Sequence, residues 1–211
     1  MGEAHVRRLA AVDIGTVTTR LLIADVTPST IEEVSRSTDI THLGEGLTET
    51  GSLNDAAMGR VVSVIESYAR KLAEHDVDAV AAVSTSAARD ASNREDFLGL
   101  LETAGIRPEI IAGEREAALS FAGATSGMRG HGLLVVDVGG GSTELVSGDS
   151  PPGPDPVSTA CSLDVGSRRI TEMFLASDPP TEAEIQAARG FIDGHVSEAI
   201  GRLAITPSQM I

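Results

Sequence analysis

The feature that most constrains the fold is a ten-residue segment that occurs twice in the chain. Val12–Leu21 reads VDIGTVTTRL and Val136–Leu145 reads VDVGGGSTEL, with the same Val, Asp, Gly, Thr and Leu at matching positions. Each copy follows one apolar stretch and precedes another, as a strand–turn–strand unit does. A repeat of this kind indicates duplication, so we predict two related domains, 1–125 and 126–211, that face each other across a cleft.

The pattern of apolar residues predicts the other elements. Strands are expected at 9–14, 20–26, 31–37, 77–83, 107–111, 133–136, 143–147 and 157–163, and helices at 54–74, 92–104, 114–124, 167–175 and 181–203. The first three strands have short connections, which favours an antiparallel meander, and four prolines within 151–156 predict a turn. Strands that then alternate with helices indicate an α/β fold with mixed sheets.

Composition excludes several classes of protein. The chain has 16 Lys and Arg against 31 Asp and Glu, a net charge of −15 and only 2% aromatic residues. A nucleic-acid partner is therefore not expected, because there is neither a basic patch nor a stacking platform. No apolar run reaches the ~18 residues of a membrane span, and no apolar segment behind Met1–Leu9 suggests a secretory signal. With Cys161 as the single cysteine, we expect a cytoplasmic protein with no membrane partner.

The repeated turn has the chemistry of a phosphate-binding site. Gly15 in the first copy and Gly139–Gly141 in the second let a phosphate approach the backbone, where successive N–H groups form a nest. The hydroxyls that follow add donors, and Asp13 and Asp137 end strands where a carboxylate can hold Mg²⁺. One copy alone is equally compatible with an ordinary tight hairpin, but two copies favour phosphate binding.

Several segments of the sequence together resemble one protein family. They are AVDIG (11–15), HLGEGL (42–47), STSAARDASN (84–93), IIAGEREA (110–117), 137–145 and SLDVGSRR (162–169). In order and spacing they are similar, as far as Leu175, to the exopolyphosphatase and guanosine pentaphosphate phosphohydrolase (Ppx/GppA) family of the actin, Hsp70 and sugar-kinase superfamily. The resemblance implies an α/β, actin-like (ribonuclease H-like) fold with two related domains around a cleft. It also implies an incomplete second domain with exposed apolar surface, because the family's further G-G-T segment would lie beyond Ile211.

The resemblance implies an enzyme that releases orthophosphate from the end of inorganic polyphosphate, or the 5′-phosphate from guanosine pentaphosphate, with the help of Mg²⁺. Glu116, in the family's G-x-x-E-A pattern, is the implied general base. Glu114 is its nearest rival, but residues two apart point to different helix faces. The implied phosphate contacts are Gly15, Thr16, Thr18, Arg89, Gly139, Gly140, Gly141, Ser142 and Thr143, and the implied Mg²⁺ ligands are Asp13, Asp137 and Glu144. Members of the family often pair as homodimers, and no residue pattern here decides that point.

Two other functions stay open. A kinase-like ATPase of the same superfamily is disfavoured, because the G-G-T nucleotide segment is absent. A non-catalytic module that binds phosphate or polyphosphate is favoured by the short chain and by Val17, since a β-branched residue is a poor choice in a turn that needs a positive φ. The net charge of −15 also suits a short substrate better than a long polyphosphate.

Overall fold

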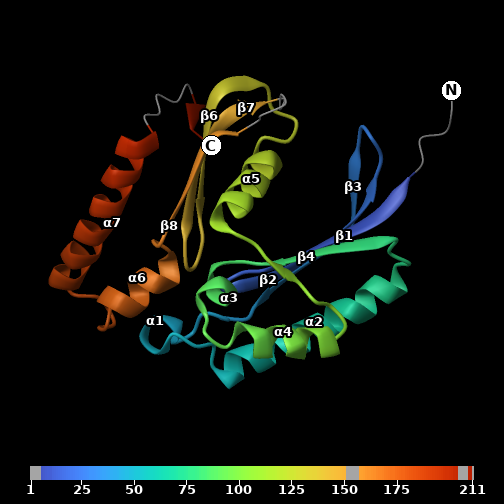
Figure 1. Cartoon of the computed structure of the whole chain (residues 1–211), viewed down its shortest axis with the longest axis horizontal. Helices are drawn as coiled ribbons and strands as arrows, with labels where there is room; N and C mark the ends of the chain where they lie inside the picture. Colours follow the sequence, from blue (N-terminus) through green and yellow to red (C-terminus); the bar gives the residue numbers. More distant parts are fainter. Residues whose placement is uncertain (1–5, 151–156, 204–208, 211) are drawn as a thin grey trace. The chain divides into compact units, whose positions relative to one another are not determined.

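The chain folds into two compact units, Met1–Ile110 and Ile111–Ile211, each built on its own sheet. The computed structural model describes residues 6–150, 157–203 and 209–210, and the predicted proline turn at 151–156 lies outside the described residues. Each unit combines a mixed sheet with helices packed on it (Figure 1). The predicted actin-like α/β fold is confirmed.

The sheet of the first unit has the strand order β3-β2-β1-β4-β5. Its strands are β1 (Arg7–Ile14), β2 (Thr18–Val26), β3 (Ile31–Ile40), β4 (Ala79–Ser84) and β5 (Glu109–Ile110). The first three form the predicted antiparallel meander, whereas β4 runs parallel to β1. A parallel neighbour requires a long crossover, and the helix α2 (Asp55–Glu74) lies within that connection.

The helices of the first unit are α1 (Leu47–Thr50), α2, α3 (Ser86–Asp90) and α4 (Arg94–Thr103). Apolar side chains of α2 and α4, including Ile65 and Phe97, form one core with Val12 and Ile14 of the sheet. At the start of α2 the Asn54 side chain accepts the N–H of Ala57 at 2.7 Å and so caps the helix.

The sheet of the second unit has the order β8-β7-β6-β9. Its strands are β6 (Gly130–Val138), β7 (Thr143–Ser150), β8 (Val157–Leu163) and β9 (Gln209–Met210), and its helices are α5 (Gly113–Ala124), α6 (Ser167–Phe174) and α7 (Glu182–Leu203). Helix α5 covers one face, where Phe121 packs against Leu133 and Val135. Helices α6 and α7 lie on the opposite face (Figure 1).

The division between the units falls before α5, earlier than the predicted boundary between residues 125 and 126. The reason is the packing of α5, which contacts all of β6, β7 and β8. Helix α5 precedes the second copy of the repeat in sequence, but it buries its apolar side against that copy. The predicted catalytic residue Glu116 is therefore in the same unit as Asp137 and Glu144.

Helix α7 begins with a capping box formed by Thr181 and Glu184. The Glu184 carboxylate accepts the Thr181 N–H at 2.7 Å and its hydroxyl at 2.8 Å, while the Glu184 N–H donates to the Thr181 hydroxyl at 3.3 Å. These bonds, together with those from Ser177, lower the pKa of Glu184 to about 2.

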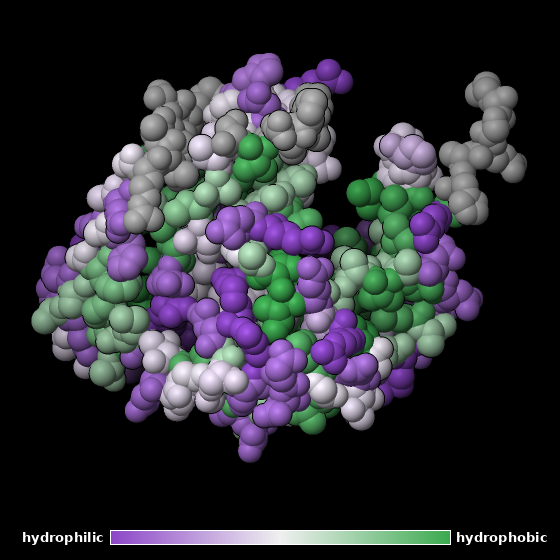
Figure 2. Space-filling view, in the orientation of Figure 1, coloured by the Kyte–Doolittle hydropathy of each residue, from purple (hydrophilic) through white to green (hydrophobic). Residues whose placement is uncertain are grey.

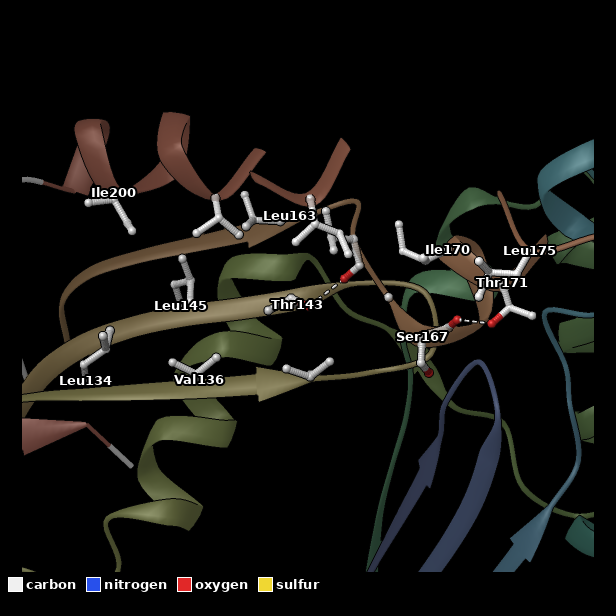
Figure 3. A pocket seen from close by; sticks show the side chains of 15 residues that line it. Leu134, Val136, Thr143, Leu145, Leu163, Ser167, Ile170, Thr171, Leu175 and Ile200 are labelled. Carbon is white, nitrogen blue, oxygen red and sulfur yellow. Dashed lines mark hydrogen bonds between the residues drawn. The ribbon is translucent and has the colours of Figure 1, made fainter. Parts of the chain in front are cut away.

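An apolar groove of about 590 Å³ crosses the face of the second sheet that carries α6 and α7. Figure 3 shows aliphatic side chains from β6, β7 and both helices lining it, including Leu134, Val136, Leu145 and Ile200. Val138 and Ile200 are more than half exposed here. The groove agrees with the expectation that the second domain exposes apolar surface.

Within the described residues, no helix is both long enough and apolar enough to cross a membrane.

Apolar side chains also reach the surface of the first unit. Figure 2 shows hydrophobic surface over the β1–β3 region, where Ile31, Val34 and Ile40 are exposed on the edge strand β3.

Candidate functional site

The second copy of the repeat forms a tight turn, Gly139–Ser142, between β6 and β7. The Gly139 N–H donates to the Ser142 carbonyl oxygen at 2.9 Å. A Cβ atom on Gly139 would lie 3.1 Å from that same oxygen, a tight contact, so the close approach of the two strands favours glycine at this position.

The start of α6 holds the carbonyl groups of this turn. The Ser167 N–H donates to Gly139 O at 2.9 Å, the Arg168 N–H to Gly140 O at 2.9 Å, and the Arg169 Nε to Gly141 O at 2.8 Å. The C=O and N–H groups of a trans peptide point in opposite directions. The N–H groups of Gly140, Gly141 and Ser142 therefore point away from α6, and the described part of the chain offers them no backbone acceptor. Three such N–H groups in succession are suited to an anion.

The contact between this turn and the residue before α6 is close. A Cβ atom on Gly166 would lie 2.5 Å from the backbone of Gly140 and Gly141. Thr143, which was also predicted to contact phosphate, instead donates its buried hydroxyl to the Val165 carbonyl oxygen at 2.6 Å. A hydroxyl hydrogen held in this way is not available to a phosphate oxygen.

Two carboxylates stand opposite each other beside the turn. Asp137 on β6 and Glu144 on β7 are direct cross-strand partners. Glu144 is only 2% exposed, and its Oε1 accepts the Ser162 hydroxyl at 2.8 Å. Like charges at facing positions destabilise a sheet, and a buried carboxylate needs compensation. This pair therefore favours a cation beside it.

Helix α5 places Glu116 on the same face of the sheet. At its start Gly113 lies against Ser162 of β8, where an added Cβ would come within 2.7 Å of the serine Cβ. Two turns later the Ser120 hydroxyl donates to Asp137 Oδ2 of β6 at 2.6 Å. The helix therefore crosses the sheet from β8 to β6, and the turn that carries Glu116 lies between these two contacts.

The structure distinguishes the two candidate bases on α5. Glu116 is half-buried and shares a face with Gly113 and Ser120, since residues three and four apart are neighbours on a helix. Glu114 is exposed and lies on another face. Glu116 also lies in the first turn of α5, where the helix dipole favours a negative charge.

The first copy of the repeat forms the same turn in the first unit. The Gly15 N–H donates to the Thr18 carbonyl oxygen at 2.9 Å, and the buried Thr16 hydroxyl lies 2.8 Å from the Ser86 hydroxyl. Val17 is not among the described residues with a positive φ. The predicted conflict between Val17 and the turn therefore does not arise, because the turn requires close approach and not a left-handed backbone.

The two copies differ in the residue that faces the aspartate. Asp13 is opposite Arg20, and the two side chains form an ion pair at 3.4 Å. At the matching place in the second copy, Asp137 is opposite Glu144. Arginine already supplies a positive charge beside Asp13, so the predicted metal site fits the second copy better than the first.

Arg89, the predicted basic phosphate contact, is half-buried in the last turn of α3. This helix begins beside the first turn, because Ser86 meets Thr16 there and the Thr85 N–H donates to the Ile14 carbonyl oxygen at 3.3 Å. The structure therefore brings Arg89 within about one helical turn of Gly15–Thr18 in the first unit.

The residues present fit Mg²⁺ only if the protein supplies one or two of its ligands and the substrate supplies others. Among the side chains that the structure describes, no group of three or more His, Cys, Asp or Glu residues could hold a metal ion. Mg²⁺ is usually held by one or two carboxylates together with substrate phosphates. Asp137 and Glu144 suit that arrangement, whereas a cage made of protein ligands alone does not fit.

Sequence reasoning missed Ser120 and Ser162, the two hydroxyl donors to these carboxylates. Ser120 could have been found from its spacing, because it lies four residues after Glu116 on the same helix face. Ser162 could be found only from the strand register, which pairs it with Glu144.

The apolar groove is not a phosphate site. Its lining is aliphatic apart from a few polar residues, and the hydroxyls of Thr143, Ser167 and Thr171 each donate to a backbone carbonyl oxygen. A phosphate would find no free donor from these side chains. The anion-binding geometry of the second unit lies instead at the turn Gly139–Ser142.

Comparison with known proteins finds similar sequences over most of the chain. Residues 22–207 match the model of the Ppx/GppA phosphatase family. The chain is 39% identical over 205 residues to exopolyphosphatase 2 of Mycobacterium tuberculosis, covering 92% of this chain and 63% of the relative. It is 30% identical over 196 residues to exopolyphosphatase 1 of Mycobacterium bovis, covering 90% of this chain and 56% of that protein.

The chain is also similar to solved structures of exopolyphosphatase and exopolyphosphatase-like proteins. An exopolyphosphatase-like protein matches with a TM-score of 0.86 and 41% identity over 92% of this chain and 62% of the other. An exopolyphosphatase from Cytophaga hutchinsonii matches with a TM-score of 0.87 and 28% identity over 97% and 65%. The chain thus spans less than two thirds of the length of these relatives.

Proposed function

Because the chain belongs to the Ppx/GppA phosphatase family, we propose that it acts as a phosphoanhydride hydrolase that releases orthophosphate from the end of inorganic polyphosphate. The relatives named above are exopolyphosphatases, and this supports polyphosphate ahead of guanosine pentaphosphate as the substrate. The single cysteine supports a reducing compartment, and we propose the cytoplasm.

The observation that supports the proposal most is the bond from Ser120 to Asp137, because it joins the helix that carries the half-buried Glu116 to the pair of facing carboxylates beside the turn Gly139–Ser142. Phosphoryl transfer to water needs donors around the phosphoryl oxygens, charge neutralisation and a group that takes the proton of water. Each of these needs has a matching group of residues at this site.

In the proposed reaction the N–H groups of Gly140, Gly141 and Ser142 bind the oxygens of the terminal phosphate. Glu116 accepts a proton from a water molecule as that water attacks the terminal phosphorus. The P–O bond to the next phosphate breaks, and the products are orthophosphate and a chain one phosphate shorter. Glu116 lies in the first turn of α5, where the helix dipole favours a negative charge.

Mg²⁺ is part of the proposal, with Asp137 and Glu144 as the residues that would hold it. The ion would supply positive charge against the negative charge of the phosphates. The facing carboxylates support this role, since they are themselves a concentration of negative charge. Asp13, with Arg20 beside it, is the weaker candidate of the three predicted ligands.

The test is orthophosphate release by this chain from polyphosphate and from guanosine pentaphosphate, with and without Mg²⁺. The Glu116→Gln variant should lose activity by about 10²–10⁴-fold, the usual contribution of a positioned base. Glu114→Gln is the matched control, because Glu114 is exposed and only two residues away.

Metal-dependent release that Glu116→Gln removes and Glu114→Gln keeps would support the proposal. Tight binding of polyphosphate by the folded chain without any release would refute it and would favour the non-catalytic binding module. Turnover of guanosine pentaphosphate alone would refute the choice of substrate.

A further inference from the structure

We infer that Ser120 and Ser162 are positioning residues, which hold the carboxylates of Asp137 and Glu144 in place beside Glu116. The inference rests on the proposed function, because it gives these two hydroxyls a part in that same site. Neither serine belongs to the repeated turn, and each reaches its carboxylate from a different element.

Ser120 acts on the exposed member of the pair. Its hydroxyl lies 2.6 Å from Oδ2 of Asp137, a distance typical of an O–H donor bound to an ionised acceptor. The terminal torsion of an aspartate is otherwise broadly distributed, and Asp137 is exposed at the end of its strand. A bond to one carboxylate oxygen fixes this torsion and leaves the other oxygen able to bind a cation.

Ser162 acts on the buried member. Its hydroxyl donates to Oε1 of Glu144 at 2.8 Å, and the two residues are direct partners across β7 and β8. The first residue of α5, Gly113, lies so close to Ser162 that an added Cβ would come within 2.7 Å of the serine Cβ. The start of the helix, the serine and the carboxylate are therefore placed together.

The two contacts fix α5 at both ends of the turn that carries Glu116. Gly113 packs against β8, and Ser120 is bonded to β6. The position of Glu116 relative to Asp137 and Glu144 therefore depends on both contacts. Groups that orient metal ligands without touching the metal change metal affinity or activity by about 10–100-fold when removed.

The experiment compares Ser120→Ala and Ser162→Ala with the unaltered chain. Two quantities are measured: the dissociation constant of Mg²⁺ by calorimetry, and kcat and KM for orthophosphate release from polyphosphate. We expect each variant to bind Mg²⁺ about 10-fold more weakly and to lose about 10-fold in kcat, with little change in KM for polyphosphate. Ser120→Thr, which keeps the hydroxyl, should restore both quantities.

The matched control is Ser63→Ala on α2. Ser63 is also a helix serine, and its hydroxyl donates to the Gly59 carbonyl oxygen at 3.0 Å, in the first unit. This variant should match the unaltered chain in both measurements. Thermal unfolding of each variant shows whether it is folded. Ser120→Ala is expected to lose less folding stability than Ser162→Ala, because Asp137, the carboxylate partner of Ser120, is exposed.

The inference is overturned if folded Ser120→Ala matches the unaltered chain in Mg²⁺ binding, or if Ser120→Thr fails to restore it. It is also overturned if the unaltered chain binds no Mg²⁺. If the unaltered chain binds Mg²⁺ but releases no orthophosphate, the proposed function fails while weaker binding by Ser120→Ala still supports the inference.

Discussion

Replacing Gly166 with alanine should displace the turn Gly139–Ser142, which we propose binds phosphate. The backbone of Gly166 is extended, with φ −146° and ψ 156°, so alanine can adopt it without strain. The new Cβ, however, would lie 2.5 Å from the backbone of Gly140 and Gly141. Carbon atoms pack at about 3.5–4.0 Å, so the turn and the start of α6 must separate by about 1 Å.

Gly166→Ala should reduce both folding stability and the rate of orthophosphate release. Overpacking of this kind costs about 1–3 kcal/mol of folding stability, and each kcal/mol lowers the Tm of a chain this size by about 2–4 °C. A displacement of about 1 Å at a reacting group can cost about 100-fold in rate. Gly166→Ala should therefore lower both Tm and orthophosphate release, and the loss of activity should exceed what partial unfolding accounts for.

The measurements are thermal unfolding by circular dichroism and orthophosphate release from polyphosphate at a temperature well below both transitions. Gly190→Ala is the control, because Gly190 lies inside α7 with no atom within 4 Å of an added Cβ. In a helix this change stabilises by about 0.5–1 kcal/mol. A Gly166→Ala variant with unchanged Tm and activity would refute the close contact between α6 and the turn.

Three further predictions concern the cap of α7, the core and the groove. The pKa of Glu184 in the folded chain is about 2, below its ordinary value of 4.5. The ionised carboxylate therefore stabilises the fold above pH 4.5, and this stabilisation is lost as the pH falls toward 2. Glu184→Gln should remove that part of the pH dependence of Tm. Tyr68 is the single tyrosine of a chain without tryptophan, and burial followed by its bond to Asp39 raises its pKa. Phenolate absorbance near 295 nm should therefore appear only when the chain unfolds in alkali, and titration of the native chain near pH 10 would contradict its burial. The apolar groove should bind the dye ANS in the native state, and Ile200→Ser should lower the fluorescence without lowering Tm. Leu119→Ser, an equally exposed site on α5 away from the groove, should not change it.

Several features were predictable from sequence because they depend on residues close together in the chain. The repeated turn follows from glycine and hydroxyl residues at fixed spacing, and the Asn54 cap and the Thr181–Glu184 capping box follow from local side-chain hydrogen bonds. Regular spacing of apolar residues likewise predicts α2 and the first three strands.

Other features could not be predicted, because they depend on which distant segments pack together. The sequence suggests that helix α5 belongs to the first domain, but it packs on the second sheet. The Thr143 hydroxyl was predicted to contact phosphate, yet it faces a carbonyl oxygen on the opposite side of its strand. Neither outcome has a signature in the neighbouring residues.

The sequence by itself determined that the same glycine and hydroxyl turn occurs twice and that Glu116 lies in a helix before the second copy. The repeat itself shows Arg20 where the second copy has Glu144, and the strand register shows that each of them faces the aspartate of its copy. Only the tertiary structure decided that α5 crosses the second sheet so that Ser120 reaches Asp137. The register of a tight hairpin follows from its turn, but the crossing of a helix over a sheet arises from the packing of whole elements, so short-range patterns in the chain do not contain it.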